Sequence, residues 1–143
     1  MKINIEDMCI ETDENLYSYE DFNNILGNTI EFLKEKGFKA DSKIPIWCYD
    51  NLHIIALTLA AISMNACAVL IDAQKKDKEV LDIMEMISES GIISDIEKAE
   101  LQGMEIFEYN INLIKNIKYN QYMYPVFETE DEEKDAVIIF TSG

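Results

Sequence analysis

The chain has 143 residues, 48% of them hydrophobic, which is enough for one compact domain with a sizeable core. It carries 12 Lys and Arg against 28 Asp and Glu, a formal charge of −16, and a surface this negative repels nucleic-acid phosphates and anionic lipids. The acidic N-terminus has no basic stretch followed by an apolar core, and the apolar window at 54–62 is too short to span a bilayer. We therefore expect a cytoplasmic protein without nucleic-acid or membrane partners.

The N-terminal segment predicts a β-hairpin followed by a helix. Residues 8–12 and 16–18 are extended candidates on either side of a polar turn at 13–15. Ser18 and Asp21 have capping-box spacing, which marks the start of a helix that Gly37 is expected to end as a C-cap. Apolar residues recur along it every three or four positions: Tyr19, Phe22, Leu26, Ile30 and Leu33.

The next segment alternates strands and helices. Residues 44–49 (IPIWCY) are apolar throughout, typical of a strand covered on both faces, and Pro45 places its beginning at the sheet margin. Asp50 or Asn51 caps a helix that runs to about residue 66 and is apolar nearly all round, which indicates burial between layers. A second strand at 68–71 ends at Asp72.

A helix is then expected over 77–90 with Gly91 as its cap, followed by a third strand at 92–93, a weak helix at 96–101 and a strand at 104–108. This alternation predicts right-handed βαβ crossovers, and therefore an α/β fold with a parallel sheet flanked by helices.

Residues 118–135 lack periodicity and end in ETEDEEKD, which favours a solvated acidic linker over a metal-binding cluster. Residues 136–140 are apolar and predict a last, buried strand. We thus expect an α/β subdomain with an N-terminal hairpin at 1–117, an acidic linker at 118–135, and a strand with the start of a loop at 136–143.

That loop is the candidate site. Thr141, Ser142 and Gly143 follow the carboxyl end of the last strand, where ligands bind in open parallel sheets. Two hydroxyls and a glycine that lets backbone N–H groups converge suit a phosphate. The tripeptide alone is ordinary loop composition and lacks the Gly-x-x-x-x-Gly-Lys frame of a P-loop.

Its context adds a resemblance to a family. DAVIIFTSG resembles the opening of the phosphate-loop signature of adenylate-forming (AMP-binding) enzymes, an apolar strand followed by YTSGTTGxPK. LYSYEDF is similar to that family's LTYxEL segment, GFKADSKIPIWCYDN to GLKxGDRVAILLxN, ALTLAAISMNACAVLIDA to ALLAxLKAGAxxVPLDP, and EVLDIMEMISESGIISD to a helix ending in DSGAKxxI. The similarity covers residues 16–95 and 135–143. Asn65 stands where the family usually has Gly, and Leu70 and Ala73 where it often has Pro.

The resemblance implies the N-terminal subdomain portion of an ATP-dependent carboxylate ligase such as an acyl-CoA synthetase or a nonribosomal peptide synthetase adenylation domain. Such an enzyme joins a fatty, aryl or amino acid to AMP from Mg-ATP and passes the acyl group to the thiol of CoA or a carrier protein. It also implies that Thr141, Ser142 and Gly143 contact the phosphates of ATP, and that the rest of the loop, the pockets and the catalytic residues lie beyond residue 143. We expect the isolated chain to bind no cofactor, to be inactive and to self-associate.

Other polar residues have structural interpretations. His53, in the first turn of a buried helix, is more simply a structural histidine than a catalytic base, since no nucleophile is paired with it. Asp72 could contact a ligand, but the resemblance makes it part of a turn. The three cysteines, Cys9, Cys48 and Cys67, have no metal-site spacing and fit a reducing cytosol. The alternative to the ligase fragment is a free-standing, non-catalytic α/β module that acts through protein–protein contacts.

Overall fold

The computed structural model describes residues 2–4, 9–12, 16–114 and 135–140. Two sheets are present in this part of the chain. A small antiparallel sheet has the order β1-β2-β3, and a five-stranded sheet has the order β7-β6-β4-β5-β8 with every neighbouring pair parallel. The α/β class with a parallel sheet and helical crossovers is thus confirmed.

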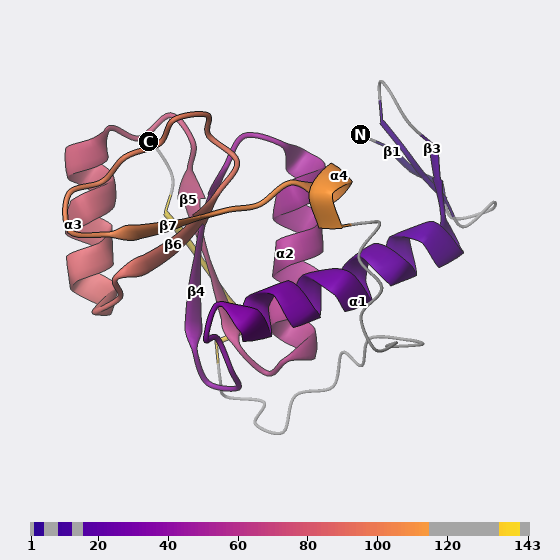
Figure 1. Cartoon of the computed structure of the whole chain (residues 1–143), viewed down its shortest axis with the longest axis horizontal. Coiled ribbons are helices and arrows are strands. Elements are labelled where there is room, and N and C mark those ends of the chain that lie inside the picture. Colours follow the sequence, from indigo (N-terminus) through magenta and orange to yellow (C-terminus); the bar gives the residue numbers. More distant parts are fainter. Residues whose placement is uncertain (1, 5–8, 13–15, 115–134, 141–143) are drawn as a thin grey trace.

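The small sheet consists of β1 (Lys2–Asn4), β2 (Cys9–Glu11) and β3 (Leu16–Ser18), and it lies at the N-terminal end of α1 (Tyr19–Glu35), away from the large sheet (Figure 1). The predicted hairpin is β2–β3, with Cys9 opposite Ser18, and β1 adds a strand that the sequence analysis missed. The capping box is confirmed: Ser18 Oγ accepts the amide of Asp21, and Asp21 Oδ2 accepts the amide of Ser18. Gly37, with φ of 93°, follows the C-cap Lys36.

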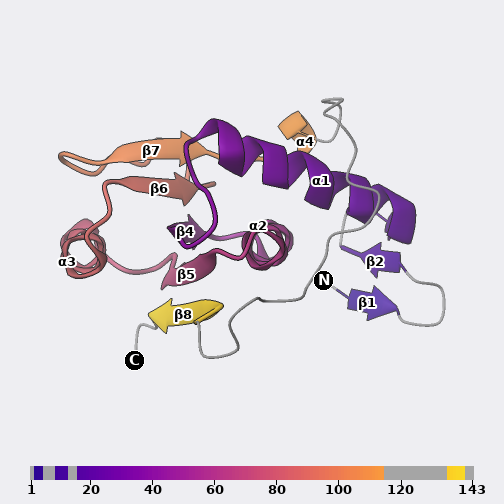
Figure 2. The same cartoon turned by 90° about the horizontal axis from the view of Figure 1, so that it is seen from below.

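The large sheet is built from β4 (Lys43–Cys48), β5 (Cys67–Asp72), β6 (Gly91–Ser94), β7 (Glu105–Glu108) and β8 (Val137–Phe140). The helices α1 and α2 (Asn51–Ser63) cover one face and α3 (Asp77–Ile87) covers the other (Figure 2). Because side chains alternate along a strand, β4 sends Ile44, Ile46 and Cys48 into the core beneath α1 and α2, and Trp47 into the core beneath α3. The sheet therefore separates two apolar cores.

Pro45 is fully buried in the central strand of this sheet. It is tolerated there because β6 pairs with β4 only at Ile46 and Trp47, so the missing N–H of Pro45 lies before the start of that ladder. The beginning of β4 is thus at the margin of the pairing with β6, as the sequence indicated.

Three expectations were wrong in detail, and one helix was not expected. The helix expected at 77–90 ends at Ile87, because Ser88 adopts φ of 58° and closes it. Gly91 is not a cap but the first residue of β6, where a Cβ atom would lie 2.8 Å from Cε2 of Phe107. The weak helix at 96–101 is absent; Lys98, with φ of 56°, turns the chain there. The short helix α4 (Ile111–Ile114) was not predicted.

Two further expectations concerned burial. The helix α2 ends at Ser63 and lies beside α1 on the sheet, so only one side of it is fully buried. Its outer residues are half-buried: Ile54, Ile55, Thr58, Leu59 and Ile62. Among the described residues the last strand, β8, forms an edge of the sheet, and Ile139 is 63% exposed.

Candidate functional site

A cleft lies at the carboxyl ends of β4, β5 and β8, on the side of the sheet that α2 covers. Its volume is about 340 Å³, and it is lined by Cys48, Tyr49, Asn51, Ile54, Leu70, Ile71, Asp72, Ala73, Gln74, Ile139 and Phe140. The floor is largely apolar, and the polar groups come from the turns that follow β4 and β5. Parallel sheets place ligands at this edge, so the cleft is the best candidate site in the described part of the chain.

The strand β8 ends directly at this cleft. It pairs in parallel with β5, from Val137 opposite Ala68 to Phe140 opposite Ile71, so its carboxyl end lies at the same edge as that of β5. The predicted site residues Thr141, Ser142 and Gly143 come next in the sequence and lie outside the described residues. The structure shows the strand that precedes them and leaves their contacts as a prediction. Residues 118–134 of the expected linker also lie outside the described part.

An aspartate lies at or just after the carboxyl end of each of the neighbouring strands β4, β5 and β6. Each of these carboxylates accepts backbone N–H groups of a turn at this edge of the sheet. Asp50 Oδ1 accepts the amide of Leu52 at 2.8 Å, which makes Asp50, one of the two candidates, the N-cap of α2. Asp72 Oδ1 accepts the amide of Gln74 at 2.8 Å, as its interpretation as a turn residue requires, although Asp72 also lines the cleft. Asp95, at the end of β6, accepts the amides of Tyr49 at 2.7 Å and Asp50 at 3.0 Å.

His53 is structural, as expected. It is 6% exposed, and its Nδ1 lies 2.9 Å from Oδ2 of Asp95. The amide of Ile111 donates to its Nε2 at 3.2 Å, so Nε2 is an acceptor and Nδ1 carries the proton. With both ring nitrogens occupied and the ring buried, His53 is not positioned as a catalytic base.

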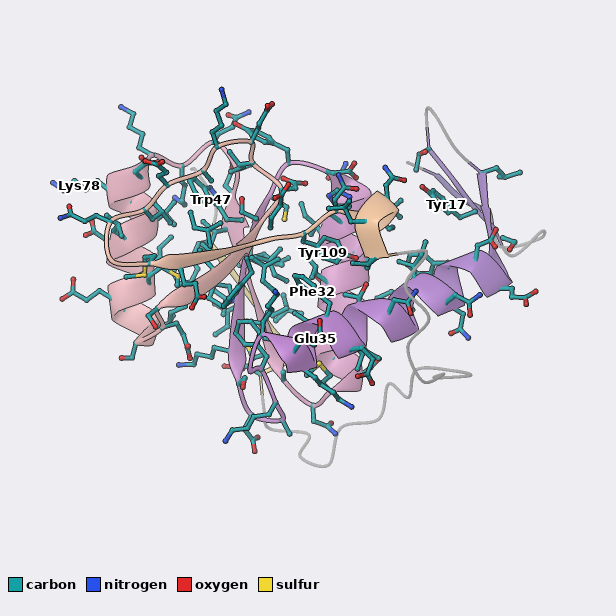
Figure 3. All side chains as sticks on the ribbon, viewed as in Figure 1. Tyr17, Phe32, Glu35, Trp47, Lys78 and Tyr109 are labelled. Carbon is teal, nitrogen blue, oxygen red and sulfur yellow. The ribbon has the colours of Figure 1, made fainter. Side chains whose placement is uncertain are left out.

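Two buried aromatic rings extend this network to α1. Tyr109 packs edge-on against His53, at 5.2 Å between ring centroids. It also packs edge-on against Phe32 of α1, at 5.4 Å between centroids (Figure 3). The Tyr109 hydroxyl hydrogen-bonds to Thr29 Oγ1 at 2.8 Å. Burial raises the pKa of Tyr109 by more than the hydrogen bond with Thr29 lowers it, so the phenol stays protonated. The arrangement fixes the cleft-forming turns to the helical layer.

Sequence reasoning missed the role of Asp95. A usable signal was present, since Asp50, Asp72 and Asp95 stand at the carboxyl ends of three predicted parallel strands that should meet at one edge. Only the structure shows that Asp95 accepts hydrogen bonds from the turn after β4, and not from the turn after β6.

Cys48, which lines the cleft, is buried and is not a reactive thiol. Cys48 is 3% exposed, and burial raises the pKa of its thiol, with the charges of Asp95 and Asp50 acting in the same direction. It therefore stays a protonated thiol. Cys67 is buried as well, so two of the three cysteines are packed as small apolar groups.

The charge around the cleft bears on what it can hold. Its lining contains no lysine, arginine or histidine, and its ionisable carboxyl group is that of Asp72. Among the described residues no group of three or more His, Cys, Asp and Glu side chains could hold a metal ion. The described lining thus suits an apolar group, and any positive charge that neutralises a phosphate would have to come from outside it. No helix in the described ranges is long and apolar enough to cross a membrane.

Comparisons with known proteins give the fold a precedent. No family model and no curated protein sequence matches the chain. The N-terminal subdomain of NpsA from Klebsiella oxytoca matches with a TM-score of 0.68 and 13% identity, over 92% of this chain and 33% of that one. The o-succinylbenzoate CoA synthetase MenE from Bacillus subtilis, in complex with its acyl-adenylate intermediate, matches with a TM-score of 0.71 and 12% identity over 92% and 34%.

The chain has the fold of the N-terminal subdomain of adenylate-forming enzymes. McyG A-PCP, solved with phenylalanyl-adenylate, agrees with a TM-score of 0.62 and 20% identity over 94% of this chain and 23% of that one. The chain spans about a third or less of the length of these structures.

The departure from the adenylate-forming pattern at Asn65 has a physical reason. Asn65 follows α2 with φ of 59°, a left-handed conformation that glycine adopts freely and that asparagine tolerates better than most residues. Asn at this position is thus compatible with the left-handed turn after α2.

Proposed function

We propose that this chain is the N-terminal part of an ATP-dependent carboxylate ligase, which activates a carboxylic acid as an acyl-adenylate and transfers it to a thiol. The observation that carries the proposal is the position of β8. This strand pairs with β5 in a sheet that has the adenylate-forming fold, and its last residue, Phe140, lines the cleft at the carboxyl ends of β4 and β5.

In this proposal Thr141 and Ser142 donate hydroxyl hydrogen bonds to the phosphates of ATP, and Gly143 allows close approach of the backbone. Donors held in place before the reaction stabilise the charge that develops on the departing pyrophosphate. The lining of the cleft supplies no cation, so the remaining charge stabilisation would come from a longer polypeptide and from the Mg²⁺ that accompanies ATP.

The thiol acceptor is CoA or a carrier protein. Support for this class comes from the similar structures, which include a CoA synthetase and a protein solved as an A-PCP unit. The described residues do not favour one acceptor over the other.

The first test is the coding sequence after codon 143. A reading frame that continues with Thr or Ser, Gly, any residue, Pro and Lys supports the ligase. A stop codon at that position contradicts it and favours the non-catalytic module.

The second test is ATP–pyrophosphate exchange by the longest natural polypeptide containing this chain, assayed with fatty, aryl and amino acids. Thr141→Ala and Ser142→Ala should each lower the exchange rate by about ten- to a thousandfold, because each removes a preorganised donor. Ser90→Ala, at an exposed serine that does not line the cleft, is the matched control. Full exchange by both variants would rule out the proposed phosphate contacts. The 143-residue chain alone should show only background exchange.

A further inference from the structure

The short helix α4 is attached to the helical layer by a histidine that acts as an acceptor. Nε2 of His53 on α2 accepts the amide of Ile111, the first residue of α4, at 3.2 Å. His53 and Ile111 are 6% and 3% exposed, so this bond is shielded from water. The other ring nitrogen, Nδ1, lies 2.9 Å from Asp95 and carries the proton of the neutral ring. The bond to α4 therefore exists only while Nε2 lacks a proton.

A proton on Nε2 would place two donors against each other. A doubly protonated imidazole has no acceptor atom, so the amide of Ile111 would lose its partner in a buried position. A buried donor without an acceptor destabilises the arrangement that contains it. Movement of α4 away from α2 removes the conflict, because both N–H groups then reach water. The released position of α4 thus binds the proton more tightly than the docked one, and a lower pH favours release.

The other attachments of this segment decide how far the release extends. On α1, Nδ2 of Asn28 donates to the carbonyl oxygen of Ile114 at 3.0 Å, and this bond would break as α4 moves. Tyr109, two residues before α4, is held independently. Its amide donates to the carbonyl oxygen of Ser94, and its hydroxyl is hydrogen-bonded to α1. We therefore expect the chain to hinge at Asn110, between Tyr109 and the first residue of α4.

The ionisable groups around His53 come from several elements. Asp95 follows β6, Asp50 caps α2 itself, Cys48 ends β4 and Tyr109 precedes α4. The neighbouring side chains of α1 contribute an uncharged amide and an uncharged hydroxyl. Burial raises the pKa of Cys48 and of Tyr109, so both stay protonated as the pH falls. The two carboxylates favour a positively charged ring, and the bond to α4 opposes it only while α4 is docked.

We propose that His53 is a pH-sensitive switch for α4: when Nε2 takes up a proton from water, the bond to Ile111 breaks, and α4 leaves α1 and α2 while Tyr109 stays in place. The chain contains a single histidine, and histidine is the side chain whose ordinary change of charge falls between pH 5 and 8. The switch goes beyond the proposed ligase activity and does not depend on it.

The test is NMR of the 143-residue chain between pH 7 and 5. The protection factor of the Ile111 amide against hydrogen exchange should fall at least about tenfold over this range, because release is coupled to uptake of one proton. The fall should accompany the titration of the ring signals of His53. The amide of Tyr109, bonded to Ser94, is the internal control, and its protection should change by less than about threefold.

Three variants separate the ring from other groups. His53→Gln offers an oxygen to the amide of Ile111 but takes up no proton, so protection of Ile111 should no longer depend on pH. Glu89→Gln, just after α3, is the matched control: burial raises the pKa of Glu89, and removal of its titration should leave the pH response of Ile111 intact. Asn28→Ala removes the second polar bond to α4 and should lower protection of Ile111 at least about threefold at every pH. It serves as the second variant if His53→Gln does not fold.

Three results would overturn the proposal. The first is constant protection of Ile111 between pH 7 and 5, whether or not the ring of His53 titrates. The second is equal loss of protection at Ile111 and Tyr109, which would show that the whole region opens together. The third is a full pH response in His53→Gln, which would assign the proton to another group.

Discussion

The Nδ1–H group of His53 on α2 donates a hydrogen bond to Oδ2 of Asp95, 2.9 Å away and directly after β6. The same carboxylate accepts the amides of Tyr49 and Asp50, and Nε2 of His53 accepts the amide of Ile111. One buried pair therefore joins the turn after β4, the end of β6 and the start of α4.

Loss of this carboxylate should be costly. Asp95→Ala leaves three donors without their acceptor, and we expect the free energy of unfolding to fall by about 2–4 kcal/mol. Urea unfolding followed by circular dichroism measures it. Asp82→Ala, at an exposed position on α3, is the control and should change stability by less than about 0.5 kcal/mol. Equal stability of the two variants would show that the network contributes little.

The close approach of Gly91 and Phe107 predicts a clash that a second substitution can relieve. Gly91→Ala puts a methyl group 2.8 Å from Cε2 of Phe107, whose ring also packs edge-on against Phe38. The variant should lose about 1–3 kcal/mol of stability. Combination with Phe107→Leu should cost less than the sum of the two single changes. Strict additivity would mean that the ring moves aside freely.

Asn65 offers a test of backbone conformation. Its φ of 59° should make Asn65→Gly nearly neutral, within about 0.5 kcal/mol, whereas Asn65→Val should cost about 1–2 kcal/mol or more because a β-branched residue is strained there. Thermal unfolding of the two variants distinguishes them. A glycine variant as unstable as the valine variant would assign the stability to the Asn65 side chain instead of the backbone.

Cys48 should be unreactive in the folded protein. In a Cys9→Ala, Cys67→Ala variant it is the remaining thiol, and at pH 8 it should react with a disulfide reagent at least about a hundredfold more slowly than in urea. The thiol of the unfolded chain ionises near pH 8.5, while burial raises the pKa of Cys48 in the folded protein. The free energy of unfolding should therefore fall as the pH rises above about 8.5, by up to about 1.4 kcal/mol per pH unit. Fast labelling of the native protein would contradict the buried geometry.

The sequence predicted the repeating parts of the fold well, because local chemistry dictates them. The capping box at Ser18, the helical stripe of α1 and the apolar strands β4 and β5 follow from spacing alone. The edge position of β8 and the cap at Ser88 did not, because sheet order and left-handed turns depend on tertiary contacts. For the site, the sequence predicted that β8 ends at the carboxyl edge of the sheet. It did not predict the hydrogen bond between Asp95 and the turn after β4, because that bond joins residues far apart in the chain.

The cleft depends on a strand that, among the described residues, pairs with one neighbour, β5. Its wall at Ile139 and Phe140 comes from β8, whose ladder partner β5 lies far earlier in the chain. Detachment of β8 would erase the cleft while β4, β5, β6 and β7 stayed paired, at a free energy below that of complete unfolding. Any ligand of the cleft thus binds only the fraction of molecules in which β8 is docked, and its apparent dissociation constant rises as that fraction falls.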